Sequence, residues 1–248
     1  MIPAPDAALI AAAGVLAGIV GSAGGITSLV SYPALLAVGV PALTANIANI
    51  VALVACWPGS ALASRPELRD RGPWLRRWAW VSAAGGAAGS ALLLSTPSQA
   101  FTRVVPFLVA AGSVALLAQP RITALRQRRG RDNRVVLPAG LAVMSAYNGY
   151  FGAGSGVLTL GLMLLTVDQR LPQANALKNM LIGAASVVSA LIFIVLGPID
   201  WAAVLPLAAG LFIGSTIGPR LTRHVPAGVI RWLAGLLGLG LAVSLWIG

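Results

Sequence analysis

The chain contains the same glycine-rich motif twice, and each copy interrupts a long apolar stretch. The first copy reads GIVGSAGG over residues 18–25, and the second reads GYFGAGSG over residues 149–156. Three glycines recur in register, because Gly18, Gly21 and Gly25 correspond to Gly149, Gly152 and Gly156. Each copy is followed by a second apolar run, a proline and an Asn-containing helix opening. Paired, glycine-broken hydrophobic segments in two halves of a chain are typical of a binding site near the membrane midplane.

The composition places the chain in a membrane. Hydrophobic residues make up 58% of the sequence and charged residues 9%, and the mean hydropathy is +0.87. Soluble domains carry about 25% charged residues, so a very apolar soluble protein is a poor alternative. The apolar runs approach the roughly 20 residues that a spanning helix needs, and they lack the alternation of an outer-membrane barrel. We therefore predict an all-α integral membrane protein in a lipid bilayer.

The net charge of +11 comes from arginines clustered in short loops between apolar runs. Such clusters set the orientation of a membrane protein, because short basic loops stay in the cytoplasm. They do not indicate a nucleic-acid partner. We predict that loops 64–77, 119–134 and 220–231 lie on the cytoplasmic side of the inner membrane.

Two halves of similar design are predicted on either side of a basic cytoplasmic linker, 119–134. The first repeat is 1–118 and the second is 135–248, and each has a glycine-broken segment followed by three transmembrane helices. The broken segments are 7–40 and 135–167. The helices are predicted at 45–63, 78–95 and 100–118 in the first half and at 174–196, 201–219 and 229–247 in the second.

The basic loops also constrain the path of the broken segments. Segment 135–167 must begin and end in the cytoplasm, and segment 7–40 must begin and end outside. Each arm of about 15 residues is roughly 22 Å long as a helix, enough to reach the midplane and return. The halves then form an inverted-topology repeat. The segments are either re-entrant hairpins or pairs of short spanning helices, since a single tilted crossing would place arginines on both sides.

The glycine turns are the first candidate for a binding site. Glycine-rich backbone at membrane depth is tolerated where it is buried in protein or lines a wet cavity. The N–H groups at the start of a half-helix after such a turn favour an anion. We expect three residues from each turn to line one site: Ser22, Gly24, Gly25, Gly154, Ser155 and Gly156. The alternative is that the glycines only allow close helix packing.

Lys178 is the only lysine of the chain and lies about one turn into a predicted membrane helix. A lysine at this depth is costly and usually faces a cavity or a partner. Asn175 and Asn179 share its helix face, and Asn46 and Asn49 form a similar face in the first half. Four amides and one ammonium would provide donors for an oxyanion. The alternatives are that Lys178 extends to lipid headgroups and that the asparagines only link helices.

Acidic side chains are predicted only in loops, at helix ends and near the N-terminus. A sodium site, a carboxylate proton relay or a cationic substrate is therefore not expected. The single cysteine, Cys56, excludes an internal disulfide and a cysteine-based metal cluster. The sequence has no nucleophile–base, metal or phosphate-loop motif, so we expect no cofactor and an anionic ligand. A membrane enzyme is the alternative from another class.

Several stretches give the chain a family resemblance. They are GVLAGIVGSAGG and SYPALLAVGVP in the first half, and GYFGAGSGVLTL, ANALKN, GPIDW and GPRLTRHVPAGVIR in the second. At these residues the chain resembles the sulfite exporter TauE/SafE family of bacterial membrane permeases, and the resemblance covers essentially the whole sequence. It implies a secondary transporter that moves sulfite, sulfonates or related sulfur anions across the inner membrane, typically outward and coupled to the proton-motive force.

We therefore expect an alternating-access transporter whose partners are a small sulfur-containing anion, the lipid bilayer and, for coupling, protons. A channel-like permease for other small anions or sulfur compounds is an alternative, as is a membrane enzyme or assembly factor. A channel would conduct without saturation, and an enzyme or assembly factor would give no substrate-dependent flux in liposomes.

Overall fold

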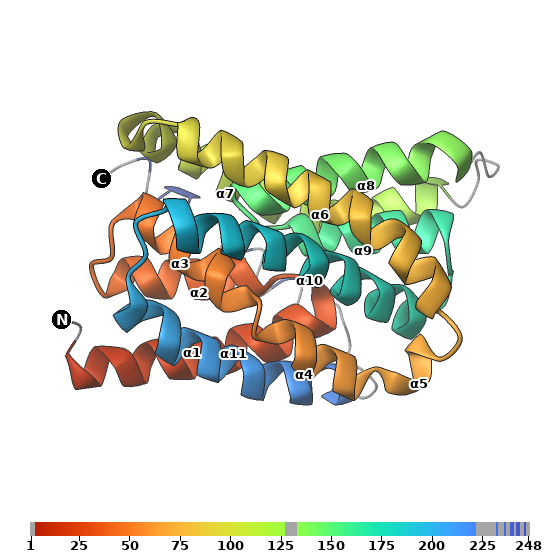
Figure 1. Ribbon diagram of the computed structural model, residues 1–248, viewed down its shortest axis with the longest axis horizontal. Helices are drawn as coiled ribbons and strands as arrows, with labels where there is room; N and C mark the ends of the chain where they lie inside the picture. Colours follow the sequence, from red (N-terminus) through yellow and green to blue (C-terminus); the bar gives the residue numbers. More distant parts are fainter. Residues whose placement is uncertain are drawn as a thin grey trace.

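The computed structural model describes residues 3–126 and 133–221, together with isolated residues between 232 and 246. Every regular element in these residues is an α-helix (Figure 1), which confirms the predicted all-α class. Four of the described stretches are long and apolar enough to cross a membrane, as a multi-pass protein requires. They are Ala4–Ser22, Ala42–Ala63, Leu171–Leu196 and Trp201–Arg220.

The two halves share an order of elements. The first half contains α1 (Ala4–Gly24), α2 (Thr27–Ala37), α3 (Ala42–Leu53), α4 (Cys56–Ala63), α5 (Arg65–Leu68), α6 (Gly72–Ser95) and α7 (Ser98–Arg126). The second contains α8 (Asn133–Tyr150), α9 (Ser155–Thr166), α10 (Leu171–Leu196) and α11 (Trp201–Leu221). In each half a long helix, a glycine turn and a short apolar helix precede the further helices.

The glycine-broken segments have unequal arms. Helices α1 and α8 contain 21 and 18 residues, whereas α2 and α9 contain 11 and 12. The prediction of two similar arms is therefore wrong: the first arm is roughly 30 Å long and the second roughly 17 Å. The turns between them place Gly25, Gly152 and Gly154 at φ values of 81°, 82° and 80°, which glycine adopts without strain.

The helix predicted at 45–63 is interrupted at Val54 and Ala55, between α3 and α4. Pro58 explains the break, because it has no N–H to donate to the Val54 carbonyl and its ring clashes with that group. The N–H of Trp57 donates to the Val54 carbonyl instead, at 3.1 Å. The tighter turn places Trp57 at the start of α4.

The other predicted boundaries shift in the structure. Helix α7 continues to Arg126 and α8 begins at Asn133, so the predicted linker 119–134 is helical over much of its described length. Good helix formers such as leucine, alanine and arginine explain the extension. Loop 64–77 contains α5 and the first turn of α6. Loop 220–231 and the helix predicted at 229–247 lie almost entirely outside the described residues.

The two halves exchange their first long helices. Helix α1 packs along α11 of the second half, and α8 packs along α6 of the first. A Cβ on Gly18 would lie 2.6 Å from the Leu211 carbonyl oxygen, and one on Gly149 would overlap the Gly86 carbonyl. These glycines let helix backbones approach closely. Helices α1 and α8 also start at opposite ends of the molecule (Figure 1), while the inverted repeat and the orientation of the halves in a membrane stay predictions.

Candidate functional site

The two glycine turns cross in direct backbone contact. A Cβ on Gly156 would lie 2.5 Å from the Gly25 Cα, and one on Gly25 would lie 2.8 Å from the Gly156 carbonyl oxygen. The backbones therefore touch, and neither position has room for a side chain. The turn glycines serve a different purpose from Gly18 and Gly149, which pack against neighbouring helices.

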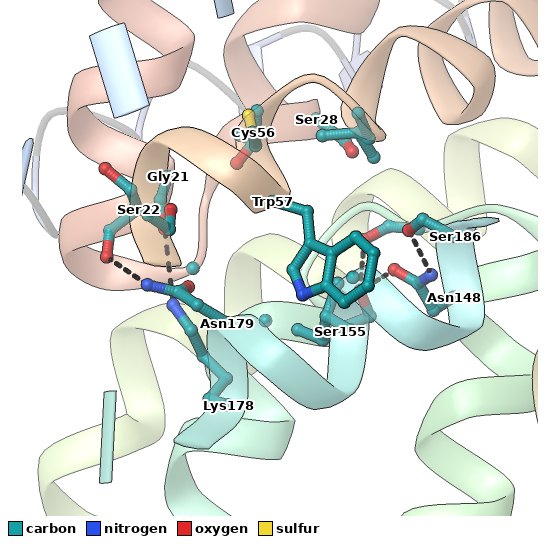
Figure 2. A pocket seen from close by; sticks show the side chains of 18 residues that line it. Gly21, Ser22, Ser28, Cys56, Trp57, Asn148, Ser155, Lys178, Asn179 and Ser186 are labelled. Carbon is teal, nitrogen blue, oxygen red and sulfur yellow. Dashed lines mark hydrogen bonds between the residues drawn. The ribbon is translucent and has the colours of Figure 1, made fainter. Parts of the chain in front are cut away.

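A cavity of about 50 Å³ lies beside this crossing (Figure 2). Its walls come from both glycine turns and from α1, α2, α3, α4, α8, α9 and α10. The lining residues are Gly21, Ser22, Gly25, Thr27, Ser28, Leu53, Cys56, Trp57, Ser60, Asn148, Gly152, Ser155, Gly156, Lys178, Asn179, Ile182, Gly183 and Ser186. Six of the eleven residues expected at a site therefore line it. These six are Ser22, Gly25, Ser155, Gly156, Lys178 and Asn179.

Lys178 brings a positive charge into the cavity wall without a carboxylate beside it. Its side chain is only 1% exposed, and its Nζ donates a hydrogen bond to the Gly21 carbonyl at 3.3 Å (Figure 2). Among the described residues, the ion pairs all involve Asp168 and none involves Lys178. Lys178 therefore lies inside the protein instead of extending to a lipid interface. The ammonium also lies near the C-terminus of α1, where a cation is favoured.

The asparagines bind the ends of the broken helices. Asn175 and Asn179 donate to the Ser22 carbonyl at 2.7 and 3.0 Å, and Asn46 donates to the Tyr150 carbonyl at 2.9 Å. These carbonyls lie in the last turns of α1 and α8, where helical N–H partners are missing. One N–H of each amide is therefore used by backbone, and Asn46 and Asn175 do not line the cavity, whereas Asn179 does. That the amides hold a ligand stays a prediction.

Asn49 is also engaged within the protein. Its Oδ1 accepts a hydrogen bond from Ser31 at 2.5 Å, and its Nδ2 donates to the Ser28 hydroxyl at 3.0 Å. Only Ser28 of this group lines the cavity. Asn49 can therefore reach a ligand only by orienting the Ser28 hydroxyl.

A second polar group forms the opposite wall (Figure 2). Asn148 donates to the Ser186 hydroxyl at 3.1 Å and accepts a hydrogen bond from Ser155 at 2.8 Å. Sequence analysis missed Ser186, although it lies two turns after Lys178 on the same face of α10. Extending that face along the helix would have found it.

Two of the predicted turn glycines lie away from the cavity. Gly24 has open space around it, and Gly154 packs against Gly112 of α7. The backbone N–H groups expected to face an anion are partly used as well. That of Gly25 donates to the Gly21 carbonyl at 2.6 Å, and that of Ser155 donates to the Gly152 carbonyl at 3.1 Å.

An ion-pair cluster lies outside the cavity, in the turn between α9 and α10. The Asp168 carboxylate accepts hydrogen bonds from Arg71 at 2.7 Å and from Arg170 at 3.1 Å. The hydrogen bond from Arg170 is the main cause that lowers the pKa of Asp168, and the charge of Arg71 adds to it. The cluster joins loop 64–77 to this turn at one end of the molecule.

The relatives found by comparison with known proteins are all named probable membrane transporter proteins. A probable membrane transporter protein, ORF9, of Sinorhizobium sp is 25% identical over 235 residues, which cover 93% of this chain and 88% of that protein. A probable membrane transporter protein of Haemophilus influenzae is 27% identical over 231 residues, covering 90% and 88%. The probable membrane transporter protein YfcA of Escherichia coli is 28% identical over 220 residues, covering 87% and 80%.

No solved structure matches the chain. The family model described as sulfite exporter TauE/SafE matches residues 7–245, which is nearly the whole sequence. The chain therefore belongs to the sulfite exporter TauE/SafE family.

Proposed function

We propose that this membrane transporter carries sulfite or another small sulfur-containing anion outward across the cytoplasmic membrane. The family and the relatives named as membrane transporters support transport as the function, and not catalysis. One observation carries the choice of an anion: the buried ammonium of Lys178 lies in the cavity wall with no counter-charge among the described residues.

The electrostatics of the cavity favour a negative ligand. A buried charge without a partner is costly, so an anion in the cavity lowers the free energy of the site. The other polar lining groups are hydroxyls, amides, the Cys56 thiol and the Trp57 indole N–H, and the lining includes no carboxylate. The serine hydroxyls of both halves can rotate to donate to anionic oxygens. A cation would meet the Lys178 charge without compensation.

The position of the cavity supports an alternating-access cycle. The cavity lies where the two glycine turns cross, between elements of both halves. Rocking one half against the other around such a site exposes it to each side of the membrane in turn. A saturable carrier, and not an open channel, is the form of transport that we propose.

Proton coupling can run through the substrate. With no carboxylate in the cavity lining, a proton relay has no acidic group there. Sulfite titrates near neutrality, so the anion itself can carry a proton across the membrane. Flux that is identical with and without a pH gradient, at a clamped membrane potential, would refute this coupling.

We also propose that the arginine-rich ends face the cytoplasm. The ion pair between Arg71 and Asp168 holds loop 64–77 against the turn between α9 and α10. Both therefore lie at the same end of the molecule, as the distribution of basic residues requires.

Flux into proteoliposomes tests the proposal. The panel contains sulfite, sulfate, thiosulfate, taurine, sulfoacetate and acetate, each measured for wild type, Lys178→Met and Arg103→Met. Arg103 is an exposed cation on α7, so its variant is a control for the loss of one charge. We expect saturable flux of one sulfur anion in the wild type. The flux should fall about tenfold or more only in Lys178→Met, because the bound anion then lacks the positive charge of Lys178.

Two results would contradict the proposal. Absence of flux for every anion in the wild type would refute anion transport. Equal flux in the two variants would refute the role of Lys178.

A further inference from the structure

Trp57 occupies an unusual position between the cavity and the surface. It lines the cavity, yet the residue is 39% exposed. Its indole is the largest side chain of the lining. In Figure 2 it stands across the cavity, between Lys178 and Asn179 on one side and Asn148 and Ser186 on the other. The indole therefore limits the size of the space next to the charged group.

The Trp57 indole packs directly against Gly183 of α10. A Cβ built on Gly183 would overlap the five-membered ring of Trp57. It would lie 2.5 Å from the Cγ atom and 2.8 Å from the Nε1 atom of that ring. The ring thus rests directly on the helix backbone, which is possible only because residue 183 has no side chain. Gly183 itself lines the cavity.

The backbone conformation also directs the Trp57 side chain toward Gly183. The break before α4 results from Pro58, and α4 packs against α10. The indole position is therefore fixed by two local features, a proline-induced break on one helix and a glycine on the other. A rigid aromatic wall of this kind discriminates between ligands by size.

The cavity is small compared with organic sulfonates. A volume of about 50 Å³ offers room for a few water molecules, since one requires about 10–15 Å³ on this measure. A pyramidal oxyanion with four heavy atoms is of comparable size. A sulfonate with an aromatic or aminoalkyl group would have to displace the indole.

We propose that Trp57, seated on Gly183, is the residue that restricts the cavity to small oxyanions and excludes sulfonates with bulky organic groups. This inference rests on the proposed function for the identity of the ligand, but the size restriction itself can be measured without any transported anion. Trp57 acts by steric exclusion, whereas Lys178 provides the charge.

The first measurement compares ligand size directly. Sulfite and benzenesulfonate are tested for binding to purified wild type, Trp57→Ala, Trp57→Phe and Trp80→Ala. Trp80 is 78% exposed and does not line the cavity, so it is the matched control. We expect the affinity for benzenesulfonate relative to sulfite to rise about tenfold or more in Trp57→Ala, within the range by which pockets discriminate on size. Trp57→Phe should give a smaller rise.

The second measurement is independent of the substrate. In a Cys56→Ser background, Ser186→Cys places one thiol on the far wall of the cavity. Methyl and benzyl methanethiosulfonate then transfer a small and a bulky group to the same thiol. We expect Trp57→Ala to raise the labelling rate of the benzyl reagent about tenfold relative to the methyl reagent, and Trp80→Ala to leave the ratio unchanged.

The outcomes separate the two proposals. An unchanged ratio of labelling rates in both Trp57→Ala and Trp57→Phe overturns the role of Trp57, whichever anion the protein binds. A raised ratio with no binding of any sulfur anion refutes the proposed function and leaves the size restriction standing. If Trp57→Ala does not yield monodisperse protein, the Trp57→Phe ratio decides.

Discussion

The crossing of the two glycine turns predicts opposite effects for two adjacent substitutions. Gly24 ends α1 and Gly25 follows it in the turn, but only a side chain at residue 25 would meet the second half. A Cβ at Gly25 would lie 2.8 Å from the Gly156 carbonyl oxygen, whereas a Cβ at Gly24 would have no atom within 4 Å. Gly25→Ala and Gly24→Ala therefore add the same methyl group to very different surroundings.

The magnitudes follow from backbone geometry and packing. Gly25 has a φ of 81°, a left-handed conformation that costs a residue with a side chain roughly 1–2 kcal/mol. The overlap with Gly156 adds about 1–3 kcal/mol for an overpacked core. We expect Gly25→Ala to lose about 2–5 kcal/mol in total. Gly24 is the last residue of α1, and Ala there should be neutral or stabilising by up to about 1 kcal/mol.

The native Cys56 provides the assay. It is the only cysteine of the chain and is partly buried in the cavity lining, so unfolding in detergent raises its rate of reaction with a thiol-reactive dye. A loss of 1 kcal/mol lowers the Tm of a chain of this size by roughly 2–4 °C. Gly25→Ala should therefore unfold roughly 4–20 °C below wild type, and Gly24→Ala at or slightly above it. Equal Tm values for the two variants would refute the crossing.

Two further predictions concern contacts outside the cavity. Asp168→Asn should lower the free energy of unfolding by about 1 kcal/mol at pH 7, because it removes two ion pairs. The loss is small because the arginine partners are partly exposed. Since the hydrogen bond from Arg170 lowers the folded-state pKa of Asp168, this stabilisation is present above the ordinary carboxyl pKa of about 3.9 and lost as the pH falls through the folded-state value. The gap in Tm between variant and wild type should therefore close in acid, and a gap that widens there would contradict the ion pairs. Asn46→Leu should lower the free energy of unfolding by about 1–3 kcal/mol more than Asn175→Leu. The first substitution leaves the Tyr150 carbonyl without its asparagine donor, whereas Asn179 still donates to the Ser22 carbonyl after the second. Thermal unfolding of both variants in one detergent would show equal losses if the amides do not cap these helices.

Much of the fold could be predicted because membrane helices and glycine breaks leave local signals. The apolar runs and the two glycine motifs correctly indicated an all-α protein with a broken segment in each half. The interruption between α3 and α4 was also encoded locally, in Pro58, but the apolar run across it concealed the signal. The unequal arms could not be read in the same way, because the length of α1 depends on its packing along α11.

The candidate site was predictable in outline and not in its details. Lys178 stood out because it is a single lysine within a long apolar segment, and the two turns stood out because they repeat. The partners of the asparagines depend on the approach of one half to the other, which no local pattern contains. Trp57 left no signal either, since its role depends on Gly183 in a helix distant in sequence.

The amide contacts suggest how the two halves can move without losing their connection. Asn46 of the first half binds the end of α8, and Asn175 of the second half binds the end of α1. Both contacts hold the ends of helices that enter the same turn region, where Gly25 and Gly156 touch. A rocking motion displaces atoms least near its pivot, so a pivot at this crossing would preserve these buried hydrogen bonds throughout the cycle. We therefore expect the crossing to stay closed in every state, and the two halves to open at points away from it.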